Sequence, residues 1–266
     1  MHGAKLRSKW LDQVDSIGNP TLIDISARAV LLDIEGTTSS IAFVHDVMFP
    51  YVRKHVREFL LENAYLPAVS DACRLILQEA SSQPDTEPLS TSTSPTPIDA
   101  VETALNRLMD EDRKSTGLKA LQGMVWKQGF QDQVLKAHVY PDVPDAIKAW
   151  RAAALDVRIY SSGSIAAQKL FFGHTEFGNM LDLFTDHYDT TIGSKKESHS
   201  YERIAALFPL DSKQIVFVSD IEAELDAAYQ AGMQVIASWR PGNAPLSANC
   251  PYARVSSFAE LNITGY

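Results

Sequence analysis

Four short apolar segments, each followed by or ending in polar residues, constrain the fold of this chain more than any other feature. They are Val30–Leu32, Val157–Ser161, Ile215–Ser219 and Gln234–Ser238. Amphipathic stretches with helical periodicity lie between the later segments. Strands that alternate with helices predict a parallel sheet with helices on both faces, joined by right-handed crossovers. The expected fold class is therefore α/β, with a Rossmann-like parallel-sheet core.

The first apolar segment is followed by two carboxylates, Asp33 and Glu35, and then by Gly36 and two threonines. Ligands of open α/β sheets bind at the carboxyl edge of the strands, so these acids are placed for chemistry. Asp33 alone would also suit the cap of a following helix. Two carboxylates this close repel each other unless they share a cation or a proton. The pair therefore indicates either a divalent metal or an acid/base couple.

Two further groups are expected at the same edge of the sheet. Ser161–Ser164 precede a helix that begins at about Ile165, and backbone N–H groups at a helix N-terminus bind anions. Serines in this place also serve as simple N-caps. Lys195 and Lys196 lie just before another predicted helix. Lysines are usually solvated, but one that reaches Asp33 would keep that carboxylate ionised and neutralise a bound phosphate.

A second acidic group follows the segment that ends at Ser219. Asp220 comes directly after it, and Glu222 and Glu224 follow within the next helical turn. Asp220 and Asp33 together supply hard oxygen ligands of the kind that Mg²⁺ prefers. Glu222 is expected to face solvent.

Composition excludes several classes of protein. The 266 residues include 33 acidic and 24 basic side chains, a net charge of −9, which argues against a nucleic-acid or anionic-membrane surface. Cys73 and Cys250, the only cysteines, indicate neither a disulfide framework nor a cysteine zinc site. No apolar run has the length of a membrane span, and no signal-peptide pattern is present, so we expect a cytoplasmic protein.

The segment from Asp46 to about Lys136 has helical periodicity without a convincing strand. This pattern predicts a helical domain inserted after the first strand of the sheet. The predicted division is an N-terminal extension (1–23), a discontinuous catalytic core (24–46 and 138–266) and a helical cap (47–137). Within the cap, the Ser/Thr/Pro-rich residues 81–97 are expected to form a flexible surface loop.

The order and spacing of these groups resemble a known superfamily. Asp33-x-Glu35-Gly36-Thr37, Ser161, Lys195, and Asp220 with Glu224 look like the four motifs of the haloacid dehalogenase-like aspartyl phosphatases. Longer segments between Val30 and Phe258 are similar to the enolase-phosphatase (acireductone synthase) family. The segments that carry this second resemblance are Asp33–Thr38, Phe43–Tyr51, Ala120–Gly123, Ile159–Ser164 and Trp239–Asn243.

The resemblance implies roles for both acids of the first motif. Asp33 would attack the phosphorus of a phosphate monoester and form an aspartyl phosphate. Glu35 would protonate the leaving oxygen and then activate water. Most phosphatases of the superfamily carry Asp where Glu35 stands, whereas enolase-phosphatases carry Glu. A general acid also counts against a dehalogenase, because a halide leaving group needs no proton.

The resemblance also implies the ligands of the site. One Mg²⁺ per chain would be held by the side chains of Asp33 and Asp220 and by the backbone carbonyl of Glu35, with Glu224 in support. The transferred phosphoryl group would be bound by Ser161, Ser162 and Lys195.

The substrate implied is a small phosphorylated diketone, 2,3-diketo-5-methylthiopentyl-1-phosphate, which is enolised and then dephosphorylated in methionine salvage. The helical insert would close over the site, with Trp126, Gln122 and Gly123 as candidate contacts, although a tryptophan in a helical domain is more often core. No coiled coil or other self-association pattern is legible, so we expect a monomer. The expected location is the cytoplasm, with the nucleus as an additional location. No residue is assigned as the base for enolisation.

Two alternatives stay open. Cap loops set substrate choice, so one alternative is a phosphatase or phosphomutase for another small phosphate ester. Fold does not fix function, so the other is a non-catalytic binding protein on this fold. The intact set of motif residues speaks against the second alternative.

Overall fold

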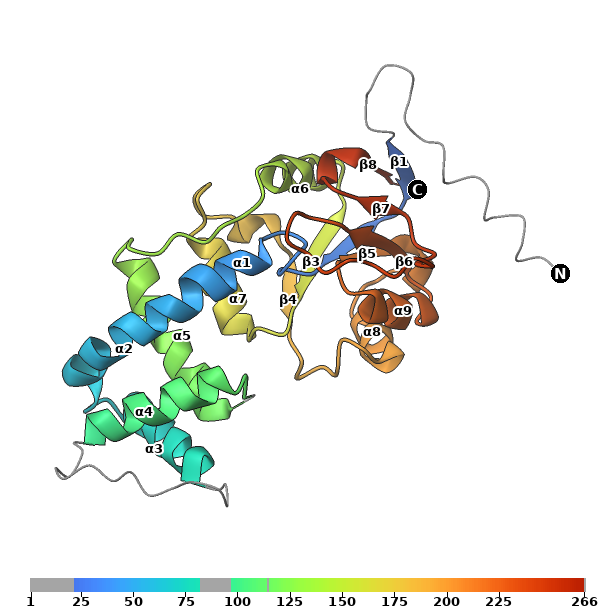
Figure 1. The fold of residues 1–266 in the computed structure, drawn as a ribbon. Helices are drawn as coiled ribbons and strands as arrows, with labels where there is room; N and C mark the ends of the chain where they lie inside the picture. The colour runs from blue at the N-terminus through green and yellow to red at the C-terminus, as the bar shows by residue number, and fades with distance from the viewer. Residues whose placement is uncertain (1–21, 82–96, 114, 266) are drawn as a thin grey trace. The chain divides into compact units, whose positions relative to one another are not determined.

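The computed structural model describes residues 22–81, 97–113 and 115–265, which fall into two compact units (Figure 1). The α/β unit contains the described residues up to Ile41, together with Val139–Ile165 and the residues from Met180 onward. The helical unit contains the described part of Ala42–His138, and Ala166–Asn179. Apart from their boundary residues, the predicted N-terminal extension and the predicted flexible loop lie outside the described residues.

The α/β unit is built on a six-stranded sheet in which every neighbouring pair of strands is parallel. In spatial order the strands are β4 (Asp186–Tyr188), β3 (Asp156–Tyr160), β2 (Ala29–Leu32), β5 (Ile215–Ser219), β6 (Gln234–Ser238) and β7 (Arg254–Val255). All residues of β2 and β5 are buried, as expected for strands covered on both faces. The predicted α/β fold class is confirmed. A separate parallel pair joins β1 (Ile23–Ser26) to β8 (Leu261–Thr264).

Helices cover both faces of this sheet (Figure 1). On one face lies α6 (Asp142–Ala152), whose Trp150 ring is 5.3 Å from the Phe258 ring. On the other face lie α8 (Ser198–Ala205) and α9 (Glu222–Gln230), which pack Tyr201 and Leu225 against the sheet. Short 3-10 turns complete the unit, namely η2 (Leu181–Leu183), η3 (Ser212–Gln214) and η4 (Phe258–Glu260).

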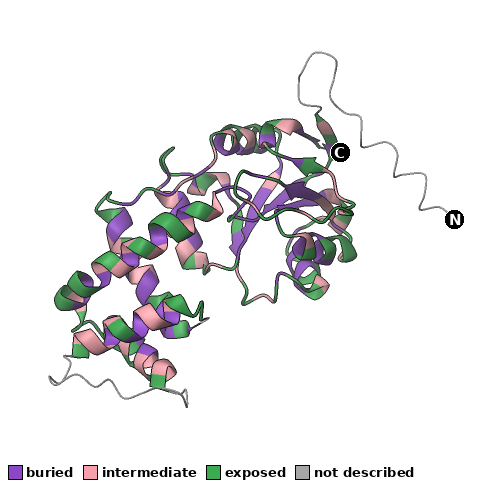
Figure 2. Ribbon diagram, viewed as in Figure 1, coloured by how far each residue is buried: buried purple, intermediate pink, exposed green. Residues whose placement is uncertain are grey.

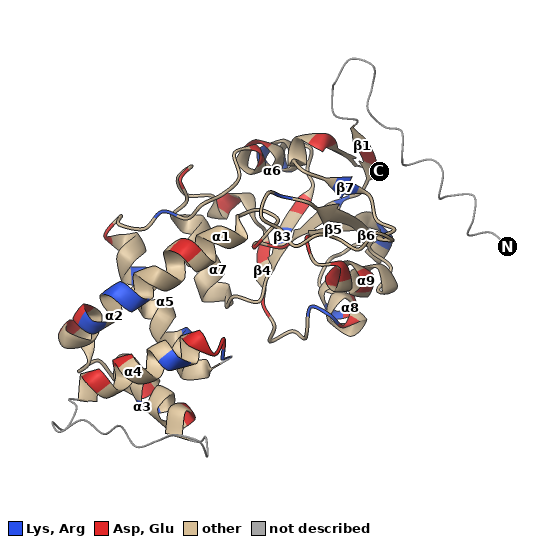
Figure 3. Cartoon of the chain, viewed as in Figure 1, with Lys and Arg blue, Asp and Glu red and all other residues tan. Residues whose placement is uncertain are grey.

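The helical unit buries the apolar faces expected from its periodicity. Its elements are α1 (Ile41–Phe43), the π-helical turn η1 (Val44–Met48), α2 (Phe49–Asn63), α3 (Pro67–Ser81), α4 (Pro97–Asp110), α5 (Thr116–Gln131) and α7 (Ile165–Gly173). Figure 2 shows buried and exposed residues side by side along these helices. Val56 and Leu60 of α2 share one core with Leu105 and Leu121 of the neighbouring helices. Figure 3 shows both acidic and basic residues on α2 and α4. The Arg53 guanidinium of α2 lies 2.6 Å from the Asp110 carboxylate of α4.

The observed units differ from the predicted division mainly in one segment; residues 42–46 and 138, also assigned to the core from sequence, fall in the helical unit as well. Residues 166–179, assigned from sequence to the core, cluster with the inserted helices. The contacts explain this, because the ring of Phe171 lies 6.0 Å from that of Phe43, and the ring of His174 lies 5.6 Å from that of Phe130. The domain boundaries read from the sequence stay a prediction. No helix within the described ranges is long and apolar enough to cross a membrane.

Candidate active site

Polar side chains gather where adjacent strands of the sheet end. Asp33 follows β2, Ser161 follows β3 and Asp220 follows β5. These strands are neighbours in the order β3, β2, β5, and the Asp33 N–H continues the pairing by donating to the Val218 carbonyl at 3.0 Å. The three side chains are buried. The parallel topology therefore brings residues from distant parts of the chain to one edge.

A buried ion cluster lies at the centre of this edge. The ammonium of Lys195 is 2.6 Å from Asp33 Oδ1 and 2.7 Å from Glu224 Oε2. The Ser219 hydroxyl lies 3.0 Å from Glu224 Oε2 and 3.4 Å from Asp33 Oδ2. The predicted Lys195–Asp33 contact is present in the structure. Glu224, which was expected to support the metal, contacts Lys195 and Ser219 directly.

The electrostatics of the cluster favour a bound cation. Burial raises the pKa of Asp220, and the Asp33 and Glu224 carboxylates raise it further, to about 7. Burial and the Asp33 carboxylate raise the pKa of Glu224 to about 7, although Lys195 acts in the opposite direction. Burial lowers the pKa of Lys195, but Asp33 and Glu224 outweigh it, so the net pKa is raised. The site thus holds more buried carboxylate than Lys195 balances.

Two tyrosines fix the backbone that presents Lys195. The Tyr201 hydroxyl donates to the Lys195 carbonyl at 2.8 Å, and the Tyr160 hydroxyl donates to the Gly193 carbonyl at 3.0 Å. Lys195 is buried whereas its neighbour Lys196 is exposed. The structure thus buries the lysine that the motif assigned to the site and leaves its neighbour in solvent.

Gly36 shapes the turn after Asp33. Its φ of +71° lies in the left-handed region, and a methyl group added there would meet Asp220 Oδ2 at 2.4 Å. The Gly36 carbonyl accepts hydrogen bonds from Ser238 Oγ at 3.0 Å and from Asn243 Nδ2 at 2.8 Å. The turn therefore needs glycine both for its backbone conformation and for the close approach of Asp220.

The two acids of the first motif have different environments. Asp33 is buried, and its Oδ1 accepts a hydrogen bond from the Ile34 N–H at 2.8 Å in addition to its contact with Lys195. Glu35 is exposed. A fixed, buried carboxylate suits a nucleophile, whereas an exposed carboxylate suits proton exchange with substrate and water.

The serine-rich turn after β3 is only partly as expected. Ser161 is buried and its Oγ accepts from the Gly163 N–H at 3.2 Å, whereas Ser162 is exposed. The N–H of Ile165, at the start of α7, donates to Asp189 Oδ2 at 3.1 Å. One backbone N–H of the predicted anion site, that of Ile165, is therefore already hydrogen-bonded to the Asp189 carboxylate.

Two residues at this edge are not among the predicted site residues. Ser219 precedes Asp220 and was visible only as the last residue of a strand. Asp189 follows β4, a strand of three residues with no apolar run to mark it. Their positions at strand ends were the signal available in the sequence.

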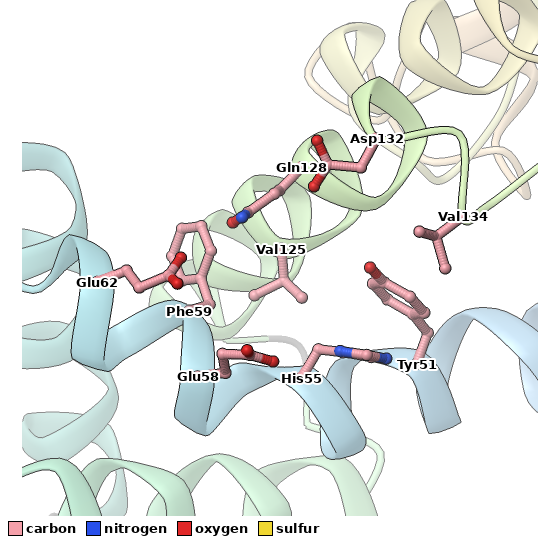
Figure 4. A pocket seen from close by; sticks show the side chains of 9 residues that line it. All are labelled: Tyr51, His55, Glu58, Phe59, Glu62, Val125, Gln128, Asp132 and Val134. Carbon is pink, nitrogen blue, oxygen red and sulfur yellow. The ribbon is translucent and has the colours of Figure 1, made fainter.

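The helical unit has its own cavity, of about 190 Å³, between α2 and α5 (Figure 4). It contains none of the predicted site residues. Its lining consists of Tyr51, His55, Glu58, Phe59, Glu62, Val125, Gln128, Asp132 and Val134. The rings of Tyr51 and His55 stack with centroids 4.2 Å apart, and Tyr51 packs closely over Gly129.

The predicted substrate contacts of the cap also lie in the helical unit. Gln122 is buried, Gly123 is half-buried, and the half-buried Trp126 donates from Nε1 to the Met48 carbonyl at 2.9 Å. Trp126 therefore satisfies a carbonyl of the π-helical turn. Its contact with substrate stays a prediction.

The fold and the order of these groups are matched by known proteins. A family model described as haloacid dehalogenase-like hydrolase matches residues 27–232. The solved structure of UTR4 protein from Saccharomyces cerevisiae superposes with a TM-score of 0.69 at 30% identity, covering 86% of this chain and 97% of that one. The class defined by fold and site is therefore that of the haloacid dehalogenase-like hydrolases.

Curated relatives place the chain in one particular family of these hydrolases. Enolase-phosphatase E1 of Drosophila erecta is 45% identical over 225 residues, which cover 83% of this chain and 86% of the relative. Enolase-phosphatase E1 of Pseudomonas aeruginosa strain UCBPP-PA14 is 44% identical over 237 residues, which cover 89% and 99%. The chain belongs to the enolase-phosphatase E1 family of these hydrolases, which confirms the resemblance drawn from its motifs.

Proposed function

We propose that this chain is an enolase-phosphatase that converts 2,3-diketo-5-methylthiopentyl-1-phosphate to an acireductone and phosphate in methionine salvage. The observation that carries the proposal is the buried Asp33 carboxylate, held at the tip of β2 by Lys195 at 2.6 Å. The names of the relatives support the choice of reaction.

Asp33 is the proposed nucleophile. The contacts of its Oδ1 with Lys195 and the Ile34 N–H stabilise the ionised carboxylate. An Asp33 oxygen bonds to phosphorus while the bond from phosphorus to the substrate oxygen breaks, which gives an aspartyl phosphate. Water then attacks phosphorus, and the bond to Asp33 breaks to release inorganic phosphate. Each displacement is easier than direct attack of water on the ester.

Glu35 is the proposed proton carrier. In the first displacement it gives its proton to the departing oxygen, and in the second it takes a proton from the attacking water. Its exposure allows both transfers without a change in the buried cluster. The leaving group is the enol formed in the first half of the reaction. Its departing oxygen takes up a proton, and the exposed Glu35 carboxyl is the proposed donor.

The residues present fit a divalent cation of the Mg²⁺ type. Asp33 and Asp220 are buried carboxylates, and the raised pKa of Asp220 reflects its burial and the neighbouring negative charge, which a cation would offset. The missing side chain of Gly36 leaves room at Asp220 Oδ2. The described residues contain no group of three or more His, Cys, Asp or Glu side chains with the spacing of a metal site. We therefore propose one ion per chain, held by Asp33, Asp220 and the Glu35 carbonyl, with water completing its shell.

The proposed ion supplies charge neutralisation, which lets an anionic nucleophile approach an anionic ester. Lys195 is proposed to bind the phosphoryl group in addition to its ion pair with Asp33. Ser161 and Ser162 are proposed to donate hydroxyl hydrogen bonds to the phosphoryl group. Glu224 holds Lys195 in place. Loss of any of these contacts should lower kcat more than it raises KM, because they act on charge that develops in the transition state.

The test is phosphate release from a panel of phosphate esters with Mg²⁺, including the diketone phosphate. We expect release from the diketone phosphate together with a transient absorbance from the enol. We expect Asp33→Asn to be inactive. Release from no ester in the panel, or full activity of Asp33→Asn, would refute the mechanism.

The proposed partner is a single small-molecule substrate, and the proposed assembly is a monomer. Light scattering coupled to size-exclusion chromatography measures the assembly directly, and a mass of twice 29.4 kDa would refute the monomer. The proposed location is the cytoplasm, with the nucleus as an additional site. Fractionation of cells that produce the chain tests this location.

A further inference from the structure

The segment after β6 anchors the turn that carries the first motif. Ser238 Oγ and Asn243 Nδ2 both donate to the Gly36 carbonyl, at 3.0 and 2.8 Å. Arg240 Nε donates to the Thr37 carbonyl at 3.2 Å. None of these residues has a role in the mechanism above, although Trp239–Asn243 is one of the segments that resemble the family.

The orientation of the Asn243 amide follows from its partners. Its Nδ2 faces two carbonyl oxygens, those of Gly36 at 2.8 Å and Ser238 at 3.4 Å. Because a carbonyl oxygen accepts and does not donate, nitrogen and not oxygen must stand on this side. Oδ1 therefore points the other way. It is buried and has no hydrogen-bond partner within the described part of the chain.

Asn243 Oδ1 and the Asp220 carboxylate, which is proposed to hold the ion, both lie close to the Cα of Gly36. A methyl group added to Gly36 would lie 3.0 Å from Asn243 Oδ1 and 2.4 Å from Asp220 Oδ2. Both oxygens thus border the small space above the Cα of Gly36. Two acceptors that face one space attract a donor or a cation, since buried polar atoms rarely stay without a partner.

We propose that Asn243 is a positioning residue of the cation site, whose Oδ1 accepts a hydrogen bond from a water in the hydration shell of the ion held by Asp33 and Asp220. This inference rests on the Mg²⁺ site of the proposed function. Mg²⁺ gives up its waters reluctantly, and waters that remain on it donate to nearby acceptors. Residues that accept from such waters orient the shell and strengthen binding.

The experiment is a calorimetric titration of the full chain with Mg²⁺. Asn243→Ala removes the acceptor and should raise the Mg²⁺ Kd by about 10- to 100-fold, the usual effect of losing an outer-shell partner. Asn243→Asp keeps an acceptor oxygen but loses the donor to Gly36, and should bind Mg²⁺ at least as tightly as the original chain. Ser238→Ala removes the other donor to Gly36 and should leave the Kd close to that of the original chain.

The variants separate the proposal from a purely structural role. If Asn243 only held the Gly36 turn, Asn243→Asp would bind as weakly as Asn243→Ala, or Ser238→Ala would match Asn243→Ala. Either result overturns the inference, as does unchanged affinity in Asn243→Ala. Thermal unfolding without Mg²⁺ establishes that each variant is folded. Mg²⁺ binding that is absent from the original chain, or unaffected by Asp220→Asn, would instead refute the cation site itself.

Discussion

Replacing Asp220 with asparagine should stabilise the metal-free protein and at the same time abolish Mg²⁺ binding. The substitution keeps the size of the side chain but removes a carboxylate that lies buried near Asp33 and Glu224. Without a cation, that carboxylate repels its neighbours and has lost its hydration. Such sites are selected for function at the expense of stability.

The magnitude follows from the raised pKa of Asp220. A rise from the ordinary value near 4 to about 7 corresponds to roughly 4 kcal/mol of unfolding free energy. Relaxation around a real buried site reduces this figure, so we expect about 2 to 4 kcal/mol. The sign is fixed by the direction of the shift. Below the unfolded pKa, near 4, Asp220 is protonated in both states and does not lower the free energy of unfolding. Between about pH 4 and pH 7 the carboxylate ionises first in the unfolded state, so the loss of stability grows, and above about pH 7 it is complete.

The assay is urea unfolding in a chelating buffer, followed by tryptophan fluorescence at pH 5 and pH 8. Trp150 is buried in the same unit as Asp220 and reports on it. Asp220→Asn should be more stable than the original chain, and its advantage should be larger at pH 8 than at pH 5. Saturating Mg²⁺ should stabilise only the original chain. An Asp220→Asn protein that is less stable at pH 8 without metal would refute the reasoning.

Three further substitutions test the site. Lys195→Met leaves the Asp33 and Glu224 carboxylates buried without the ammonium group that pairs with them. It should lower the free energy of unfolding by about 3 to 5 kcal/mol at pH 8, measured by urea unfolding, and an unchanged stability would contradict the ion cluster. Gly36→Ala places a methyl 2.4 Å from a carboxylate oxygen, so calorimetry should detect much weaker Mg²⁺ binding, and unchanged binding would contradict the geometry. Glu35→Gln should lower kcat by about 10²- to 10⁴-fold. With an activated aryl phosphate, whose leaving group needs no proton, the first displacement should be restored and appear as a burst of released phenol. A normal kcat would exclude the proton role of Glu35.

The sheet could be predicted because its central strands carry their own signal. β2, β5 and β6 are continuous apolar runs flanked by polar turns, and this pattern depends only on local sequence. β4 and β7 are three and two residues long, and β1 and β8 alternate over only four residues each, so none of them is long enough to stand out from a loop. They are strands because they pair with other strands, and those partners lie too far away in the sequence for a local pattern to reveal them.

The site shows the same limit. Asp33, Lys195 and Asp220 follow strands or precede helices in a recognisable order, so the sequence indicated them. The unpartnered oxygen of Asn243 and the Asp189 contact with α7 depend on residues far away in the chain. The sequence thus indicated the groups that carry chemistry and one contact between them, Lys195 with Asp33, whereas the contacts of Asn243 and Asp189 are visible only in the packed structure.

The order of pairing in the sheet also has a consequence for synthesis on the ribosome. Val30 of β2 pairs with Val157 and with Val216, both of which are translated after the main helices of the inserted unit. The core of those helices, from Val52 to Val125, is complete before either partner emerges. A nascent chain can therefore fold these helices first. Until its partners are synthesised, the hydrophobic β2 strand has no sheet to pair with and is open to chaperone binding or aggregation.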